Sequence, residues 1–132
     1  MIDCENEVYT KIATMLRSDF PGINVASEYV NSPSAFPHVS IVMAENSIMF
    51  SRMDSGDHEV AIAVFEINIY SNKTSGKKTE CKKIAKAIDN LLLPMNFRRM
   101  SMIPVPNMED ATIYRIVARY RVATDGKYFY RR

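Results

Sequence analysis

The chain has 132 residues, of which 47% are hydrophobic and 24% charged, and its formal net charge is +2. This length is enough for one domain, residues 1–132, to fold without a disulfide or a metal, and the composition excludes wholesale disorder. The nearly balanced charge lacks the basic excess typical of a dedicated DNA-binding domain.

Cellular location is expected to be a cytosol. The first twenty residues carry charges throughout and contain no long apolar stretch, so no signal peptide is predicted. The longest apolar runs, such as Val60–Phe65, are too short to cross a membrane. Cys4 and Cys81 lie far apart and form no CxxC motif, which favours two free thiols.

The first predicted element is a helix over about residues 4–19. Asp3 can cap its start and Pro21-Gly22 ends it. Its apolar stripe recurs at helical spacing and comprises Val8, Ile12, Met15 and Leu16.

Three strands are expected to follow this helix. Ile23–Val30 and Pro37–Met43 have strand-like content, and Glu45–His58 is a looser stretch between them and the third strand. The third strand, Glu59–Tyr70, is the strongest strand signal in the chain, with a first half that is apolar on both faces. We therefore expect Glu59–Tyr70 to be the central strand.

A second amphipathic helix is predicted over about residues 76–93 and ends at Pro94. Its apolar stripe comprises Cys81, Ile84, Ala85, Ile88, Leu91 and Leu92. Strands are expected at Phe97–Ile103 and Ala111–Ala123, and Asp125-Gly126 predicts a hairpin that returns Tyr128–Tyr130 as a short edge strand. The order α-β-β-β-α-β-β predicts an α+β fold in two layers, with two helices on one face of a mainly antiparallel sheet.

Motifs for catalysis or ligand binding are absent from the sequence. Ser71–Thr79 lacks both the first glycine and the Ser or Thr after Gly-Lys that a phosphate-binding loop needs. His38 and His58 lie in no nucleophile signature, and the adjacent Glu109-Asp110 would point to opposite faces of an extended segment. Asp54–Glu59 lacks the spacing of a calcium loop. We expect no enzyme activity, no metal and no cofactor.

Three features favour interaction with other macromolecules. Arg115, Arg119 and Arg121 share one strand face, and they either pair with Glu66 and Asn68 across the sheet or face a subunit or DNA. An apolar loop comprises Ile48, Met49, Phe50 and Met53, which either extend two strands or form a surface that a partner covers. The chain end carries Tyr128, Phe129 and Tyr130, residue types that are favoured at contacts.

Several segments carry a resemblance to known proteins. Met1–Tyr9, Ile69–Lys78, Pro104–Asn107 and Thr112–Arg115 resemble short proteins encoded in phage structural gene clusters of Firmicutes. The order of helices and strands is similar to that of the tail terminator, or tail-completion, family of long-tailed bacteriophages.

This resemblance implies a structural virion protein that is assembled in the bacterial cytoplasm. It would form a ring, a hexamer in that family, at the head-proximal end of the tail. Its partners would be further copies of itself, the tail tube protein and the head connector or stopper protein, and DNA would pass through without specific binding. The alternatives are another neck or head–tail joining protein, and a small phage-encoded nucleic-acid-binding protein.

Overall fold

The computed structural model describes residues 1–30, 33–49, 59–107 and 110–131. Its elements in chain order are α1 (Glu5–Asp19), β1 (Asn24–Ala26), β2 (His38–Ile48), β3 (Ala61–Ser71), α2 (Lys77–Leu92), the short 3₁₀ helix η2 (Leu93–Met95), β4 (Arg98–Pro104), β5 (Tyr114–Thr124) and β6 (Phe129–Tyr130). This order confirms the predicted α+β class and its sequence of elements.

The strands form one six-stranded mixed sheet with the order β1-β2-β3-β5-β4, and β6 pairs with β5. Neighbouring strands are antiparallel except β1 and β2, which are parallel, with Asn24 opposite His38. The parallel pair departs from the expectation that short turns join consecutive antiparallel strands. β1 and β2 therefore begin at the same end of the sheet.

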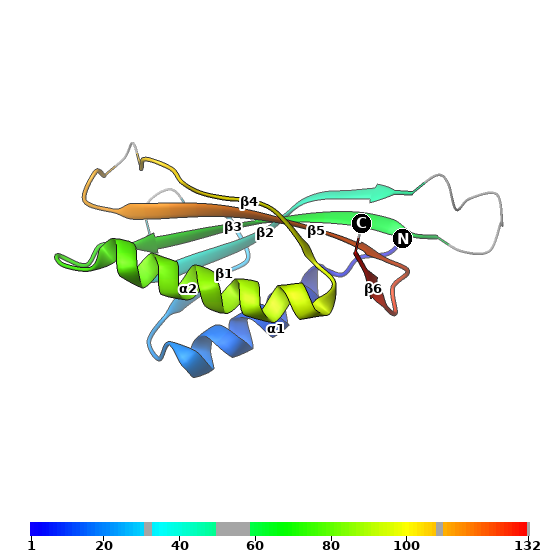
Figure 1. Ribbon diagram of the computed structural model, residues 1–132, viewed down its shortest axis with the longest axis horizontal. Coiled ribbons are helices and arrows are strands. Elements are labelled where there is room, and N and C mark those ends of the chain that lie inside the picture. Colours follow the sequence, from blue (N-terminus) through cyan, green and yellow to red (C-terminus); the bar gives the residue numbers. More distant parts are fainter. Residues whose placement is uncertain (31–32, 50–58, 108–109, 132) are drawn as a thin grey trace.

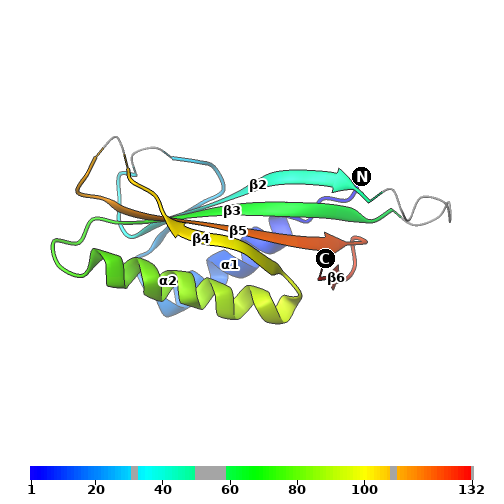
Figure 2. The same ribbon diagram turned by 45° about the horizontal axis from the view of Figure 1, so that its top comes forward.

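Both helices cover the same face of the sheet, as predicted (Figures 1 and 2). The core between these layers takes one stripe from each helix and alternate residues from the strands. β3 is the central strand, and Glu66 is its one residue that is not buried. The core cluster includes Val8, Ile12 and Leu16 of α1, Ile84, Ile88 and Leu92 of α2, and Phe65, Ile67 and Ile69 of β3.

Two helix boundaries follow from local backbone chemistry. The amide of Phe20 donates to the carbonyl of Leu16 at 2.8 Å and closes the last turn of α1, and Gly22 then adopts a φ of 88°. Gly76 precedes α2 with a φ of 88° as well. Positive φ values suit glycine because it lacks a Cβ, so these residues end one helix and start the other at the predicted places.

β1 is shorter than the predicted strand Ile23–Val30, because the residues after it contact side chains of β3 and β5 and do not continue the ladder with β2. The side chain of Tyr29 lies against the guanidinium of Arg115, and the carbonyl of Val30 accepts a hydrogen bond from Tyr70 Oη at 3.0 Å. This segment therefore covers part of the sheet face that the helices leave open. Asn68 and Tyr70, which point to that outer face, are 1% exposed as a result.

β2 is longer than the predicted strand Pro37–Met43 and continues to Ile48. Its second half is exposed, and its residues lack the alternation that reveals a half-buried strand. It stays paired with β3 down to Ile48 opposite Ala61, with a bulge between Met43 and Glu45. Figure 1 shows this end of β2 and β3 extending beyond the helices.

Candidate interaction surfaces

Of the apolar loop, the structure describes Ile48 and Met49, whereas Phe50 and Met53 lie outside the described residues. Ile48 ends β2 and is 41% exposed. The amide of Met49 donates to the carbonyl of Val60 at 2.8 Å, so the ladder between the two strands continues one step further. The described half of this segment is therefore an extension of β2 and β3, which was one of the two predicted alternatives.

The C-terminal segment divides into a packed residue and two exposed ones. Phe129 is half-buried and packs on Phe97, with ring centroids 5.5 Å apart. Its carbonyl accepts a hydrogen bond from Asn96 Nδ2 at 3.0 Å. Tyr128 and Tyr130 are 57% and 44% exposed. Phe129 thus contributes to the core, and the two tyrosines are the part of this segment that offers aromatic surface.

The predicted arginine face exists on the outer side of β5, opposite Ile116, Ala118, Tyr120 and Val122, which face the helices. Arg115 donates from Nε and Nη2 to Asn68 Oδ1 at 3.1 and 2.7 Å and also lies over the rings of Tyr29 and Tyr70. Arg119 forms an ion pair with Glu66 at 3.7 Å. Pairing with Asn68 and Glu66, one of the two predicted alternatives, accounts for these two arginines.

Arg121 differs from the other two arginines. Its neighbours across the sheet are Val64 of β3 and Arg98 of β4. Its Nε is buried and has no hydrogen-bond partner in the described part of the chain. Like charges directly opposite each other weaken a sheet. Arg98 and Arg121 therefore carry positive charge at the β4 side of the outer face. No acidic residue stands opposite them on β3 or β5.

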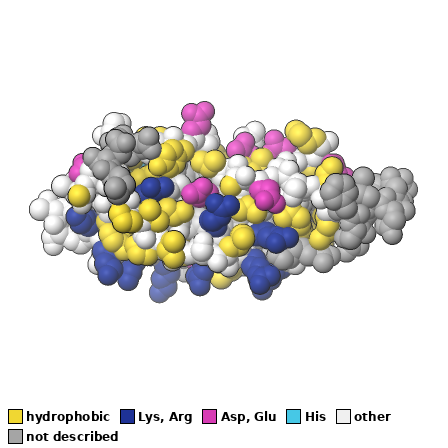
Figure 3. Space-filling view, turned by 90° about the horizontal axis from the view of Figure 1, so that it is seen from above, with side chains coloured by type: hydrophobic (Ala, Val, Ile, Leu, Met, Phe, Trp, Pro, Cys, Tyr) yellow, Lys and Arg dark blue, Asp and Glu magenta, His cyan; other side chains and the backbone are white. Residues whose placement is uncertain are grey.

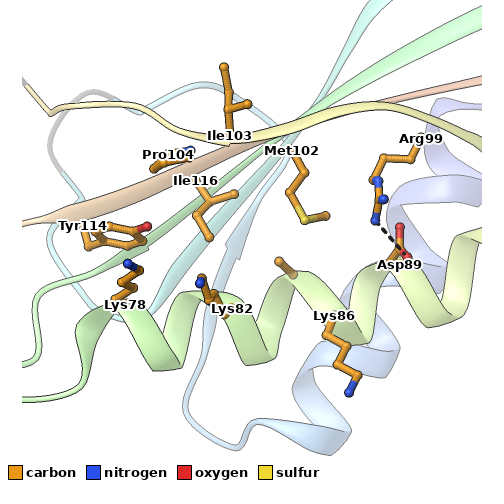
Figure 4. A pocket seen from close by; sticks show the side chains of 11 residues that line it. Lys78, Lys82, Lys86, Asp89, Arg99, Met102, Ile103, Pro104, Tyr114 and Ile116 are labelled. Atoms are coloured by element: carbon orange, nitrogen blue, oxygen red, sulfur yellow. Dashed lines mark ion pairs between the residues drawn. The ribbon is translucent and has the colours of Figure 1, made fainter.

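A groove lies between α2 and β4, and sequence reasoning did not predict it (Figure 4). It has a volume of about 510 Å³ and an apolar floor that includes Ala85, Met102 and Ile116. Lys78, Lys82 and Lys86 rim it, and at one end Arg99 pairs with Asp89 at 3.3 Å. Asp89 also accepts a hydrogen bond from Tyr120 Oη at 2.9 Å. The spacing of these lysines, four residues apart on a helix, was the available sequence signal.

The residues weighed for catalysis do not converge within the described chain. His38 is 2% exposed, and its Nδ1 accepts a hydrogen bond from Asn24 Nδ2 at 2.8 Å. Burial lowers the pKa of His38. Asp110 accepts hydrogen bonds from the amide and hydroxyl of Thr112, which lower its pKa. His58 and Glu109 lie outside the described residues.

The described residues form neither a metal-ligand cluster nor a membrane-spanning helix. No group of three or more His, Cys, Asp or Glu side chains there could hold a metal ion. None of the helices described is long and apolar enough to span a bilayer.

Comparison with known proteins gives a similarity at the level of the fold. No family model matches the sequence, and no curated protein matches it. Among solved structures, the fold is similar to that of a chain in a structure described as the virion of a native gene transfer agent (GTA) particle. The TM-score is 0.60 at 16% sequence identity, and the similarity covers 86% of this chain and 90% of that one. This chain therefore shares its fold with a chain of that particle.

Proposed function

We propose that this protein is a structural component of a phage-type virion. It is located at the head-proximal end of the tail, where a ring of copies ends polymerisation of the tail tube and joins the tail to the head connector. The similarity of fold to a chain in a GTA virion, over nearly the whole length of both chains, is the observation that carries this proposal.

The surfaces of the molecule support an assembly role. The described residues bring no set of catalytic side chains together, whereas Ile48, Tyr128 and Tyr130 expose apolar or aromatic area at one end of the sheet. A head-to-tail ring requires two different patches on each subunit. Two patches are candidates for contacts with neighbouring subunits or with the tail tube. One is the end of β2 and β3 that extends beyond the helices, and the other is the pair of C-terminal tyrosines.

Deletion of the gene from a phage that carries it tests this proposal. Without the ring, tubes should continue to polymerise, so lysates should contain tails of irregular length and separate DNA-filled heads. Electron microscopy measures tail length, and supply of the wild-type chain from a plasmid should restore joined particles. Normal joined particles from the deletion strain would contradict the proposal. Tails of regular length without heads would instead place the protein at another head–tail joining station.

A nucleic-acid-binding role is the second candidate, favoured by the exposed Lys78, Lys82 and Lys86 together with Arg98. Binding through several phosphates falls steeply as salt rises. We expect the purified protein to show no specific DNA sequence preference and only weak retention at physiological salt. Sequence-specific binding that persists at about 0.2 M salt would favour this role over the structural one.

A further inference from the structure

Resting on the proposed ring function, we propose that copies of this chain join edge to edge. The outer edge of β4 in one copy forms backbone hydrogen bonds with the outer edge of β2 in the next copy, so that the sheet continues from subunit to subunit. The partner at each edge is thus a second copy of the same chain.

The first observation is that the sheet has two open edges. β4 is a terminal strand of the sheet. At the other side, β1 covers β2 only from His38 to Ser40, which leaves Ile41–Ile48 without a partner on that edge in the described chain. An unpaired edge presents amide and carbonyl groups to any strand that can reach it. One subunit therefore carries two different edges, as a head-to-tail ring requires.

The second observation concerns strand direction. β2, β3, β5 and β4 alternate in direction across the sheet. β2 and β4 consequently run in opposite directions within one copy. A rotation about an axis along the strands leaves those directions unchanged, so β4 of one copy meets β2 of the next as an antiparallel pair. The alternation of the sheet then continues without a break.

The third observation is charge. Figure 3 looks onto the outer face and shows Lys and Arg side chains along the border of α2 and β4, whereas Asp and Glu side chains gather toward the opposite border. Exposed Arg98 and Arg99 lie on β4, and exposed Glu28 and Glu45 belong to the β1–β2 side. The two borders that the proposal brings together therefore carry opposite charge, which favours correct pairing of edges.

The sheet register makes this complementarity specific. Glu45 pairs with Val64, Val64 with Arg121 and Arg121 with Arg98, so Glu45 and Arg98 stand at opposite ends of one row on the outer face. In a ring without rise between subunits, Glu45 of one copy comes beside Arg98 of the next. This contact places a carboxylate next to the arginine pair that has none opposite it within the sheet.

The two edge strands also have their bulges at neighbouring positions along the strand direction. β2 has its bulge between Met43 and Glu45, and β4 has its bulge between Arg99 and Ser101. Because Met43 and Arg99 lie in the row that contains Phe65 and Tyr120, the two irregularities fall in adjoining rows. A bulge increases the local twist of a strand. Edges with similar twist at a shared level can pair over several residues.

Bulges and arginines also protect the edges of monomeric proteins from pairing. β2 has the bulge after Met43, but its open part contains no proline, lysine or arginine, and its one charged residue is Glu45. β4 exposes Met100 and Ile103 at 52% and 55%, and an added strand would cover these apolar side chains. Bulged edges that keep a monomer from pairing, with no contact between copies, are the alternative that the experiment must distinguish.

Disulfide trapping provides the test, with Glu45→Cys and Arg98→Cys combined in one chain. Within one copy these residues are separated by three strand spacings, about 14 Å, well beyond the ~7 Å limit for the Cα atoms of a disulfide. Any bond must therefore join two copies. The natural Cys4 and Cys81 are both buried and give little background. Glu45→Cys with Arg119→Cys, which lies on the same face but inside the sheet, is the matched control.

The variants are oxidised both as purified protein and in particles assembled from them. A covalent ladder from dimer upward in the first variant, absent from the control, is the expected result. Particles that contain the protein but yield no ladder, in either setting, would overturn the edge pairing and leave the proposed function intact. Particles that assemble normally without this protein would contradict the proposed function, and the purified-protein arm would then decide the edge pairing alone.

Charge reversal gives an independent readout of the same contact. Arg98→Glu or Glu45→Arg should each weaken association about 2–5-fold per contact, and the two changes combined should restore it. Sedimentation measures the association, and thermal melting shows that each variant is folded. Equal weakening by the single and combined variants would show that these two residues do not meet.

Discussion

Arg115, Arg119 and Arg121 occupy three different environments although they share one strand face. Arg115 is held by Asn68 and two tyrosine rings, and Arg119 pairs with Glu66. Arg121 instead faces Arg98. Sequence spacing predicted that the three side chains share a face, because alternate residues of a strand point the same way. It also offered Glu66 and Asn68 as partners across the sheet, but it could not predict the contact of Arg115 with two tyrosine rings or the position of Arg98 opposite Arg121.

His38 shows how a single buried residue affects stability. Its imidazole is nearly inaccessible, lies 5.7 Å from the ring of Tyr70, and has an Nε2 without a hydrogen-bond partner among the described residues. Charging this ring inside the protein is therefore unfavourable, and the pKa of His38 falls below its ordinary value of 6.5.

A pH dependence of stability follows from this shift. The unfolded chain binds a proton at His38 more readily than the folded chain, so stability is fully present above pH 6.5 and is lost as pH falls toward the folded pKa. Chemical denaturation of the wild type and of His38→Gln between pH 7.5 and 5 measures the difference. The variant should show the shallower decline, and parallel curves would contradict a buried neutral imidazole.

The elements differ in how far local sequence determines them. Both helices were predicted within a residue or two of their ends, because each carries a complete apolar stripe and a breaker at its boundary. The exposed second half of β2 has no such pattern, and it is a strand because β3 pairs with it. The parallel β1–β2 pair is a matter of how the two strands are arranged in space, which local periodicity does not report. Nor does periodicity reveal the groove beneath β4.

Ile88 tests the buried face of α2. It is fully buried in the core between the layers. Ile88→Asp would place a carboxylate there without a partner, at a cost of several kcal/mol, and should unfold the domain. Circular dichroism melting measures this, with Lys83→Asp on the exposed side of the same helix as the control. A soluble Ile88→Asp variant with a cooperative transition would show that the stripe faces elsewhere.

The C-terminal strand permits a separation of folding from assembly. Phe129→Ala removes a ring that packs on Phe97 and should lower the free energy of unfolding by about 2 kcal/mol, less than for a fully buried ring. Tyr128→Ser should leave the melting temperature nearly unchanged, because its ring is mostly exposed. Particle yield should fall with Tyr128→Ser if this residue contacts a partner. Normal yield would remove Tyr128 from the proposed contacts.

Across the whole molecule, the described residues cover the two faces of the sheet unequally. The helices cover one face, whereas on the other face the described segment after β1 lies over Tyr70 and Arg115. The remaining outer face and both strand edges stay open in the described chain. This arrangement leaves the sheet itself, more than the helices, available for contacts between subunits.

The two cysteines report the integrity of the whole fold. Burial raises the pKa of the Cys4 thiol to about 11 and that of Cys81 to about 12, and neither is bonded to another cysteine. Thiolates are the reactive form, so both should resist a thiol reagent such as DTNB at pH 8 until the protein unfolds. Absorbance at stepwise denaturant concentrations measures this. Rapid labelling of the native protein would contradict the packing around α1 and α2.

β3 is hydrogen-bonded along both of its sides, and the amide protons that it directs to β5 are shielded by a second inner strand, so they should need the largest opening of the fold to exchange. Their exchange with deuterium in the native protein should therefore proceed at a rate set by the overall free energy of unfolding. The amides of β4, bonded on one side at most, can exchange through local opening. If a neighbouring copy pairs with β4, exchange of the β4 amides should slow in the assembled protein toward the rate of β3, whereas exchange in β3 should change little.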